Sequence, residues 1–253
     1  MNLILLRHGQ STWNLENRFT GWKDVSLTEE GIKEAEYSGK ILLENQFNIQ
    51  SIYTSLLNRA TETTNIVAEI INYPKSQIKN DWRLNERHYG ALEGLNKSET
   101  AKKYGEDQVK IWRRSYDIPP PQLQISDIRH PKNNHKFSNL ECELPVGESL
   151  KDVISRLLPF INNYFDVIKN NNGYHLIVAH SNSLRAIVKI LEGLSEEEII
   201  EVNIPTGVPL VYELNNELNI IDKKYLIDEE TLKKKKEIVE NQGKIKWALI
   251  SNQ

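Results

Sequence analysis

The chain has little of what marks secreted, membrane-spanning or metal-binding proteins. Its 253 residues include one cysteine, Cys142, so no intramolecular disulfide can form, which fits a reducing compartment. The apolar N-terminus is broken by Arg7-His8, too early for a signal peptide or for the roughly 20 apolar residues of a membrane span. No cluster of carboxylates or cysteines has metal-ligand spacing. We therefore expect a cytoplasmic, metal-independent protein.

The chain also has no strong net charge. Lys and Arg number 32 against 35 Asp and Glu, which gives a formal net charge of −3. Such a balance carries no general attraction for nucleic acid or for an anionic membrane, and we expect neither as a partner. An anionic substrate would therefore require cations gathered at one place. Arg113-Arg114 would meet that need, although adjacent arginines are more often a solvated surface pair.

Short apolar runs alternate with amphipathic stretches along most of the chain. Strands are expected at 3–6, 51–54, 77–84, 174–179, 208–214 and 218–226. Helices are expected after the capping residue Thr28 and at 56–71, 101–116 with an interruption at Gly105, 149–169 and 183–194. This alternation predicts one domain over residues 1–253. We expect a three-layer α/β/α fold whose central sheet is mostly parallel with one antiparallel edge strand.

Two regions are less regular. Residues 117–147 contain several prolines and many Asn, His and Lys residues, and we interpret them as an inserted flap. Residues 228–253 form a charged tail with four consecutive lysines at 233–236. That run is most simply a solvated helix face, and the alternative is a mobile lid that offers cations to an anionic ligand. The sequence leaves both open and assigns no role to residues 247–253.

Two histidines directly follow two of the predicted strands. His8 comes after residues 3–6 and His180 after residues 174–179. Ligands of open parallel sheets bind outside the carboxyl ends of the strands, so both rings should emerge at one edge. If the two strands are neighbours, the rings can converge on one ligand. A lone histidine at such a place is usually structural, but two, one of them preceded by Arg7, favour a catalytic site.

The residue types around these histidines suit phosphoryl transfer. A neutral imidazole such as that of His8 can attack phosphorus and form a phosphohistidine that passes the group on. Arg7 and Arg59 supply planar donors for the charge on the transferred oxygens, and His180, if protonated, adds another. Glu86 is the candidate general acid and base. For any single glutamate a surface or ion-paired role is more common, and only the neighbours change that balance.

Longer stretches carry a family resemblance. Arg7-His8-Gly9, residues 11–14, 18–22, 84–97, 108–114, 182–185 and 203–213 together resemble the cofactor-dependent phosphoglycerate mutases of the histidine phosphatase superfamily. The similarity extends to about Lys246. Arg-His-Gly alone is shared by all branches of the superfamily, whereas the set of stretches is specific to the mutases.

The resemblance implies a reaction and a site. It implies interconversion of 3- and 2-phosphoglycerate through phosphorylated His8, with 2,3-bisphosphoglycerate as primer and intermediate, no metal, and a homodimer or homotetramer. His8 would be the nucleophile and Glu86 the proton donor and acceptor. The other catalytic residues would be Arg7, Arg59 and His180, and the substrate would be bound by Asn14, Ser11, Thr20, Gly21, Tyr89, Lys97, Arg113, Arg114 and Asn182.

Two positions depart from the family pattern. The family more often has Glu where this chain has Gln10, and Gly where it has Ser181. Gln10 removes a negative charge near the phosphate, which should not harm anion binding. Ser181 adds a side chain beside His180 at a place that could need the backbone freedom of glycine.

Three alternatives stay open. The first is a broad-specificity phosphatase of the same superfamily, which would typically lack the Arg113-Arg114 pair and the stretch around Lys97. The second is a bisphosphoglycerate mutase, in which Ser11 and Gly21 would typically be replaced. The third, a non-catalytic phosphate-binding protein, is disfavoured because both histidines and Glu86 are present.

Overall fold

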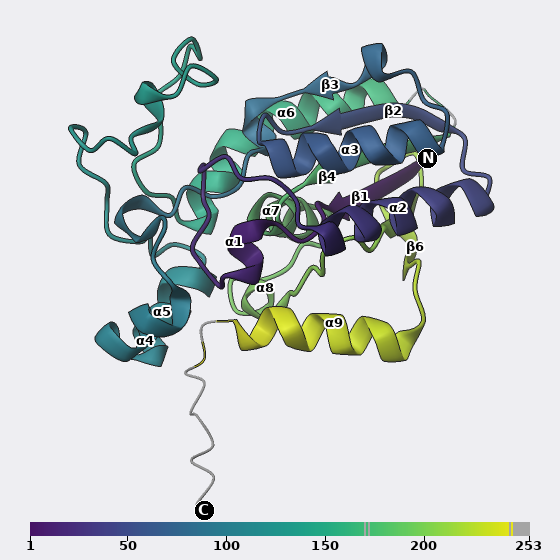
Figure 1. Ribbon diagram of the computed structural model, residues 1–253. Helices are drawn as coiled ribbons and strands as arrows, with labels where there is room; N and C mark the ends of the chain where they lie inside the picture. The colour runs from purple at the N-terminus through teal and green to yellow at the C-terminus, as the bar shows by residue number, and fades with distance from the viewer. Residues whose placement is uncertain (170, 172, 243, 245–253) are drawn as a thin grey trace, which may run out of the picture.

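A computed structural model describes residues 1–169, 171, 173–242 and 244. These residues form a six-stranded sheet in the order β3-β2-β4-β1-β5-β6 (Figure 1). The strands are β1 Asn2–Arg7, β2 Ile49–Thr54, β3 Lys79–Asn80, β4 Tyr174–Ala179, β5 Leu210–Leu214 and β6 Ile220–Tyr225. Strands β1 to β4 pair in parallel, whereas β5 pairs antiparallel with both β1 and β6. The predicted mostly parallel sheet, closed by an antiparallel pair, is confirmed, and the reversed strand β5 lies one place inside the edge.

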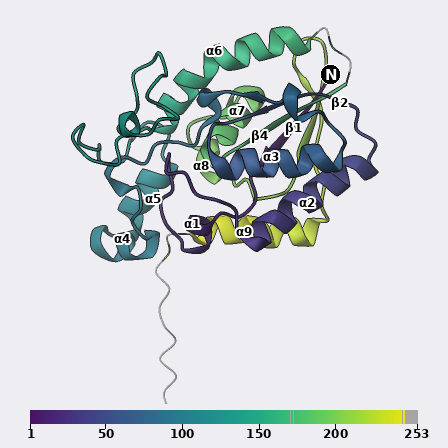
Figure 2. The same ribbon diagram turned by 45° about the horizontal axis from the view of Figure 1, so that its top comes forward.

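Helices cover both faces of the sheet, as Figures 1 and 2 show. On one side lie α6 and α7, and on the other α2 and α3. The helices of the described residues are α1 Thr12–Leu15, α2 Glu29–Glu44, α3 Asn58–Ile70, α4 Lys97–Tyr104, α5 Glu106–Arg114, α6 Leu150–Ile168, α7 Ser181–Glu192, α8 Glu198–Glu201 and α9 Glu229–Asn241. The three-layer prediction is therefore confirmed.

The alternation of side chains along β1 explains the two cores. Leu3 and Leu5 belong to the cluster with α6 and α7, whereas Ile4 and Leu6 belong to the cluster with α2 and α3. All four side chains are fully buried. Because successive side chains of a strand point to opposite faces, a strand buried on both sides must be apolar throughout. This is why β1 is a continuous apolar run that ends where Arg7 and His8 leave the sheet.

Helix ends follow local signals that the sequence contains. The Thr28 side chain accepts a hydrogen bond from Gly31 N and caps α2, as predicted. Ser149 caps α6 in a reciprocal arrangement with Asp152. Gly105 has φ +89°, a conformation that glycine adopts at low cost, and it separates α4 from α5 where an interruption was predicted.

The prediction of a strand over 77–84 is mostly wrong. Only Lys79–Asn80 pairs with the sheet, and 3-10 turns occupy Lys75–Gln77 and Trp82–Leu84. The Asp81 side chain accepts a hydrogen bond from Arg83 N, which turns the chain away from the sheet.

The predicted flap is mostly irregular, whereas the predicted tail begins with a regular helix. Residues 117–147 contain one 3-10 turn, Pro131–Asn133, and otherwise run as irregular loops, which Figure 1 shows standing away from the sheet. The tail forms α9, whose Lys235 makes an ion pair with Glu34 of α2 at 2.7 Å. Residues 247–253 lie outside the described residues.

Candidate active site

The two histidines meet because their strands are neighbours. Strands β1 and β4 are parallel, with Arg7 opposite Ala179, and His8 N donates a hydrogen bond to Ala179 O at 3.0 Å. The ring centroids of His8 and His180 lie 4.9 Å apart. The predicted convergence of the two rings at one sheet edge is therefore confirmed.

The His8 ring is held with one nitrogen available for attack. Nδ1 lies 2.7 Å from Gly9 O, a carbonyl that can only accept, so Nδ1 carries the proton. Nε2 then has a lone pair, and it faces Arg59 Nε at 3.3 Å. Burial lowers the pKa of His8 well below its ordinary value, and the nearby Arg59 and Arg7 lower it further. His8 is thus a neutral imidazole whose Nε2 can act as a nucleophile.

Gly9 is required by the approach of helix α2. A Cβ atom at Gly9 would lie 2.1 Å from Gly31 O, well inside the contact distance. The Gly9 amide instead donates to Thr63 Oγ1 of α3 at 3.0 Å. The loop after β1 is therefore fixed between two helices, which in turn fixes the His8 backbone.

The surroundings of His180 disfavour its protonated form. Its pKa is lowered well below the ordinary value by burial, and then by Arg59, His8 and Arg7. Its Nε2 lies 2.7 Å from Ser55 Oγ, while its buried Nδ1 has no partner among the described residues. The sequence left the protonation of His180 open, and a neutral ring can still donate one N–H. Ser55 directly follows strand β2, so the rule that sites lie at strand ends could have pointed to it, but its hydrogen bond to His180 was not predicted.

A strongly cationic cavity lies against His8, whereas His180 is not among its described lining residues. It is lined by Arg7, His8, Asn14, Arg18, Thr20, Arg59, Glu86, Tyr89, Lys97, Arg113, Arg114, Ser181, Asn182, Arg185, Val239 and Gln242. Among these described residues Glu86 is the only carboxylate. Local cations in an acidic chain are what an anionic substrate requires. Arg18 and Arg185 lie in stretches that carried the resemblance, yet they were not predicted as binding residues.

The cationic side chains of this cavity repel one another and lower one another's pKa values. Burial lowers the pKa of Lys97 well below its ordinary value, and Arg113 and Arg7 add to that effect. The pKa of Arg113 falls to about 9, again because of burial and then because of Arg114. An anion placed among these groups would relieve their repulsion and favour their charged forms. The electrostatics therefore suit a ligand with several negative charges.

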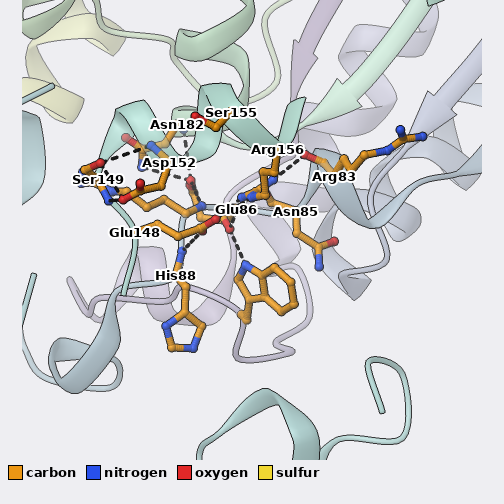
Figure 3. Close-up of polar contacts among 12 residues, drawn as sticks. Arg83, Asn85, Glu86, His88, Glu148, Ser149, Asp152, Ser155, Arg156 and Asn182 are labelled. Carbon is orange, nitrogen blue, oxygen red and sulfur yellow. Dashed lines mark hydrogen bonds and ion pairs between the residues drawn. The ribbon is translucent and has the colours of Figure 1, made fainter. Parts of the chain in front are cut away.

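Glu86 is buried and lines the same cavity as His8. Its Oε1 accepts hydrogen bonds from Asn182 N at 3.1 Å, from Asn182 Nδ2 at 3.0 Å and from Arg87 N at 2.8 Å (Figure 3). Asn182 Nδ2 also donates to Tyr89 Oη at 3.2 Å. The structure thus brings Glu86, Asn182 and Tyr89 together on one wall of the cavity.

Arg59 is aimed at His8 by the loop that follows α1. Its Nη2 donates to Gly21 O at 2.9 Å and its Nη1 to Lys23 O at 3.1 Å. The buried Glu93 holds this loop, because its Oε2 accepts from Trp22 N at 3.1 Å and from Lys23 N at 3.2 Å. Burial raises the pKa of Glu93 to about 7, against the lowering effect of these bonds and of Arg129. Sequence reasoning missed Glu93, which no spacing rule singles out.

The tail reaches the cavity with a neutral residue. Gln242 Oε1 accepts a hydrogen bond from Lys97 Nζ at 3.0 Å, and Gln242 O accepts one from Arg113 Nη1. No lysine of α9 is among the described residues that line the cavity. Lys235 pairs with Glu34, and Lys236 lies 4.6 Å from the Tyr225 ring centroid. This arrangement fits the solvated helix face, one of the two alternatives that the sequence left open.

Two predicted binding residues do not line the cavity within the described part of the chain. Ser11 caps α1, with its Oγ accepting from Asn14 N at 3.3 Å. Gly21 O accepts a hydrogen bond from Arg59 Nη2, so Gly21 contacts the site through that side chain.

The two departures from the family pattern are accommodated. Gln10 Oε1 accepts from Thr28 Oγ1 at 3.0 Å, and its side chain is not among the described residues that line the cavity. Ser181 begins α7 and is not among the residues with positive φ. The side chain of Ser181 therefore causes no backbone strain of the kind that glycine relieves.

No helix in the described ranges is long and apolar enough to cross a membrane. Among the same residues no group of three or more His, Cys, Asp or Glu side chains could hold a metal ion.

Comparison with known proteins places the chain in a family. Residues 3–223 match the model of the histidine phosphatase superfamily, branch 1. A 2,3-bisphosphoglycerate-dependent phosphoglycerate mutase from Hydrogenobaculum sp. (strain Y04AAS1) is 52% identical over 243 residues, which cover 96% of this chain and 98% of that protein. The enzyme of the same name from Borreliella burgdorferi (strain ZS7) is 49% identical over 245 residues, with 96% and 99% covered. The chain belongs to the 2,3-bisphosphoglycerate-dependent phosphoglycerate mutase family of the histidine phosphatase superfamily.

The mutase family membership confirms the resemblance found in the sequence. Solved structures agree on the fold. A mycobacterial glucosyl-3-phosphoglycerate phosphatase superposes with a TM-score of 0.65 at 21% identity, covering 88% of this chain and 96% of that one. At that identity the likeness shows the shared fold alone.

Proposed function

We propose that this protein interconverts 3-phosphoglycerate and 2-phosphoglycerate through a phosphohistidine at His8, with 2,3-bisphosphoglycerate as primer and intermediate. The observation that carries the proposal is the distribution of cations around one nucleophile. Arg7, Arg59, Lys97, Arg113 and Arg114 line the same cavity as His8, and Arg59 Nε lies 3.3 Å from His8 Nε2. Names of relatives near 50% identity over almost the whole chain support the same reaction.

His8 and Glu86 divide the chemistry between them. In one half-reaction His8 carries the phosphoryl group, and Glu86 takes the proton of the substrate hydroxyl as its oxygen attacks phosphorus. The N–P bond breaks and its electron pair returns to Nε2. In the other half-reaction Nε2 attacks the second phosphate, the P–O bond breaks, and Glu86 returns the proton to the leaving oxygen.

Surrounding groups would stabilise the charge that develops during transfer. Arg7 Nε and His180 Nδ1 are buried N–H candidates without partners among the described residues, a costly state that an anion would satisfy. Arg185 Nε is in the same state, and its residue lines the cavity. Each charged hydrogen bond contributes about 1.5–3 kcal/mol, so a ligand with several phosphate and carboxylate oxygens fits this set.

The main rival is a phosphatase, in which water and not a second substrate takes the phosphoryl group from His8. The lining by Lys97, Arg113 and Arg114 favours a mutase, because the substrate that receives the group needs its own anion site. A bisphosphoglycerate mutase uses the same groups and differs in the ratio of its activities.

The steady-state test uses 3-phosphoglycerate with and without 2,3-bisphosphoglycerate. We expect formation of 2-phosphoglycerate that requires the bisphosphate as primer, survives a chelator, and disappears in His8→Ala. Release of inorganic phosphate without 2-phosphoglycerate would instead identify a phosphatase.

The resemblance also supports finer proposals. We propose that the enzyme is a metal-independent cytoplasmic homodimer or homotetramer that acts on phosphoglycerates and binds neither nucleic acid nor membranes. Sedimentation equilibrium measures the oligomeric state directly, and a monomer at micromolar concentration would contradict the proposal.

A further inference from the structure

A buried ion pair contacts the backbone on both sides of Glu86. Arg156 of α6 and Glu148 are joined by Nε and Oε1 at 2.6 Å, and their side chains are 9% and 5% exposed. A second contact joins Arg156 Nη2 to Glu148 Oε2 at 3.3 Å. Buried ion pairs are weak evidence for stability, because removing both charges from water offsets most of their attraction. The contacts that the pair makes beyond itself are therefore informative.

These contacts converge on the segment that carries Glu86. Arg156 Nη2 donates to Asn85 O at 2.9 Å and to Glu86 O at 3.1 Å, and Nη1 donates to Arg83 O. Glu148 Oε2 accepts from His88 N at 2.7 Å. Figure 3 shows the contacts of Arg156 and Glu148 with this segment, together with that of Asn182 with Glu86.

The segment needs such a clamp because it has no regular secondary structure. A 3-10 turn ends at Leu84 and the next begins at Gly90, so the backbone groups between them have no helical or ladder partners of their own. The planar guanidinium of Arg156 can bind several carbonyl oxygens and a carboxylate at once, which the ammonium of lysine cannot do in the same geometry. Arg156 thus binds the Glu86 backbone carbonyl, while Asn182 binds the Glu86 carboxylate.

We propose that Arg156 and Glu148 are positioning residues that fix Glu86 for proton transfer. The proposal rests on the proposed function, in which Glu86 exchanges the proton. Neither residue lines the cavity in the described part of the chain, so neither is expected to bind substrate. A shift of about 1 Å in a reacting group can cost on the order of 100-fold in rate. Loosening the clamp should therefore slow the steps that depend on Glu86 and spare those that do not.

Two phosphate esters separate these steps. When His8 attacks 2,3-bisphosphoglycerate, the leaving alkoxide oxygen needs a proton from Glu86. When it attacks p-nitrophenyl phosphate, the phenolate is weakly basic and leaves without that proton. We expect Arg156→Lys to lower the single-turnover rate of His8 phosphorylation by the bisphosphate roughly tenfold or more, with the first-turnover release of p-nitrophenolate from p-nitrophenyl phosphate changed less than about twofold. The first turnover is measured because the later attack of water on the phosphohistidine is common to both esters and also needs Glu86. Glu148→Gln should give the same pattern to a smaller degree.

Two further variants make the experiment decisive. Glu86→Gln should reproduce the selective loss, and Arg83→Lys should leave both rates unchanged, since the Arg83 side chain pairs with Asp81 outside the clamp. Near-ultraviolet circular dichroism checks that each variant is folded. If Arg156→Lys does not fold, Glu148→Gln is the variant that tests the proposal. Equal loss on both esters in the clamp variants, or no loss on either, would overturn the positioning role. If Glu86→Gln itself lacks the selective loss, the proposed proton donor is wrong instead.

Discussion

Replacing Glu93 by glutamine should change how the stability of the protein depends on pH. Glu93 is 4% exposed, and its pKa is raised from 4.5 to about 7 mainly by burial. The folded state therefore binds more protons than the unfolded state between those values. The stabilising effect of the protonated carboxyl is fully present below pH 4.5 and is lost as pH rises through 7. At 1.36 kcal/mol per pKa unit, the loss amounts to about 3 kcal/mol at pH 8.

The Glu93→Gln variant removes this titration and keeps an acceptor oxygen for Trp22 N and Lys23 N. We expect the difference in free energy of unfolding between variant and parent to move in favour of the variant by about 2.5 kcal/mol between pH 5 and pH 8, because part of the effect is already lost at pH 5. Urea denaturation at several pH values measures that difference, and other titrating groups cancel in it. Glu99→Gln, at an exposed site on α4, is the matched control and should show no such change. A pH-independent difference for Glu93→Gln would refute the reasoning.

Three further predictions concern the site. Arg113→Met should weaken binding of 2,3-bisphosphoglycerate by roughly 10- to 100-fold, the loss of one charged hydrogen bond, as measured by calorimetry, and an unchanged Kd would contradict its role. Gly9→Ala should unfold at a much lower temperature than the parent, because its Cβ would lie 2.1 Å from Gly31 O, and an unchanged Tm would be inconsistent with that packing. The rate of His8 phosphorylation should show no break near pH 6.5, since burial, Arg59 and Arg7 hold the pKa of His8 well below that value. A rate that titrates there in rapid-quench experiments would rule out the neutral nucleophile.

Much of the fold followed from the sequence because its signals are local. The apolar run of β1, the Thr28 cap and the interruption at Gly105 each report a backbone preference that the structure satisfies. The strand expected at 77–84 failed because Asp81 forms a turn with Arg83 N, and this local hydrogen bond outweighs the strand pattern.

Site residues could be predicted where a side chain suited to phosphoryl transfer directly follows a predicted strand. His8, His180 and Glu86 could be chosen because their residue types suit the reaction, and the neighbouring strands then bring the two rings together. Glu93 and Arg156 could not be chosen in this way. Their importance lies in hydrogen bonds to backbone groups that are distant in sequence, and no pattern of side chains records those contacts.

The position of the tail was also beyond the sequence. Four lysines suggested either a solvated face or a cationic lid, whereas Gln242 is the tail residue that meets Lys97. Its contact depends on the packing of α9 against the body of the protein through Lys235 and Glu34. Charge patterns along a helix do not contain that information.

The most direct test of phosphoryl transfer by His8 is a single-turnover chase. The protein is labelled with radioactive 2,3-bisphosphoglycerate, the label is located by peptide mapping under alkaline conditions, and monophosphoglycerate is then added. We predict an acid-labile phosphohistidine at His8 whose label passes to monophosphoglycerate faster than to water. Label at another residue, or label that leaves only as inorganic phosphate, would contradict the proposed mutase mechanism.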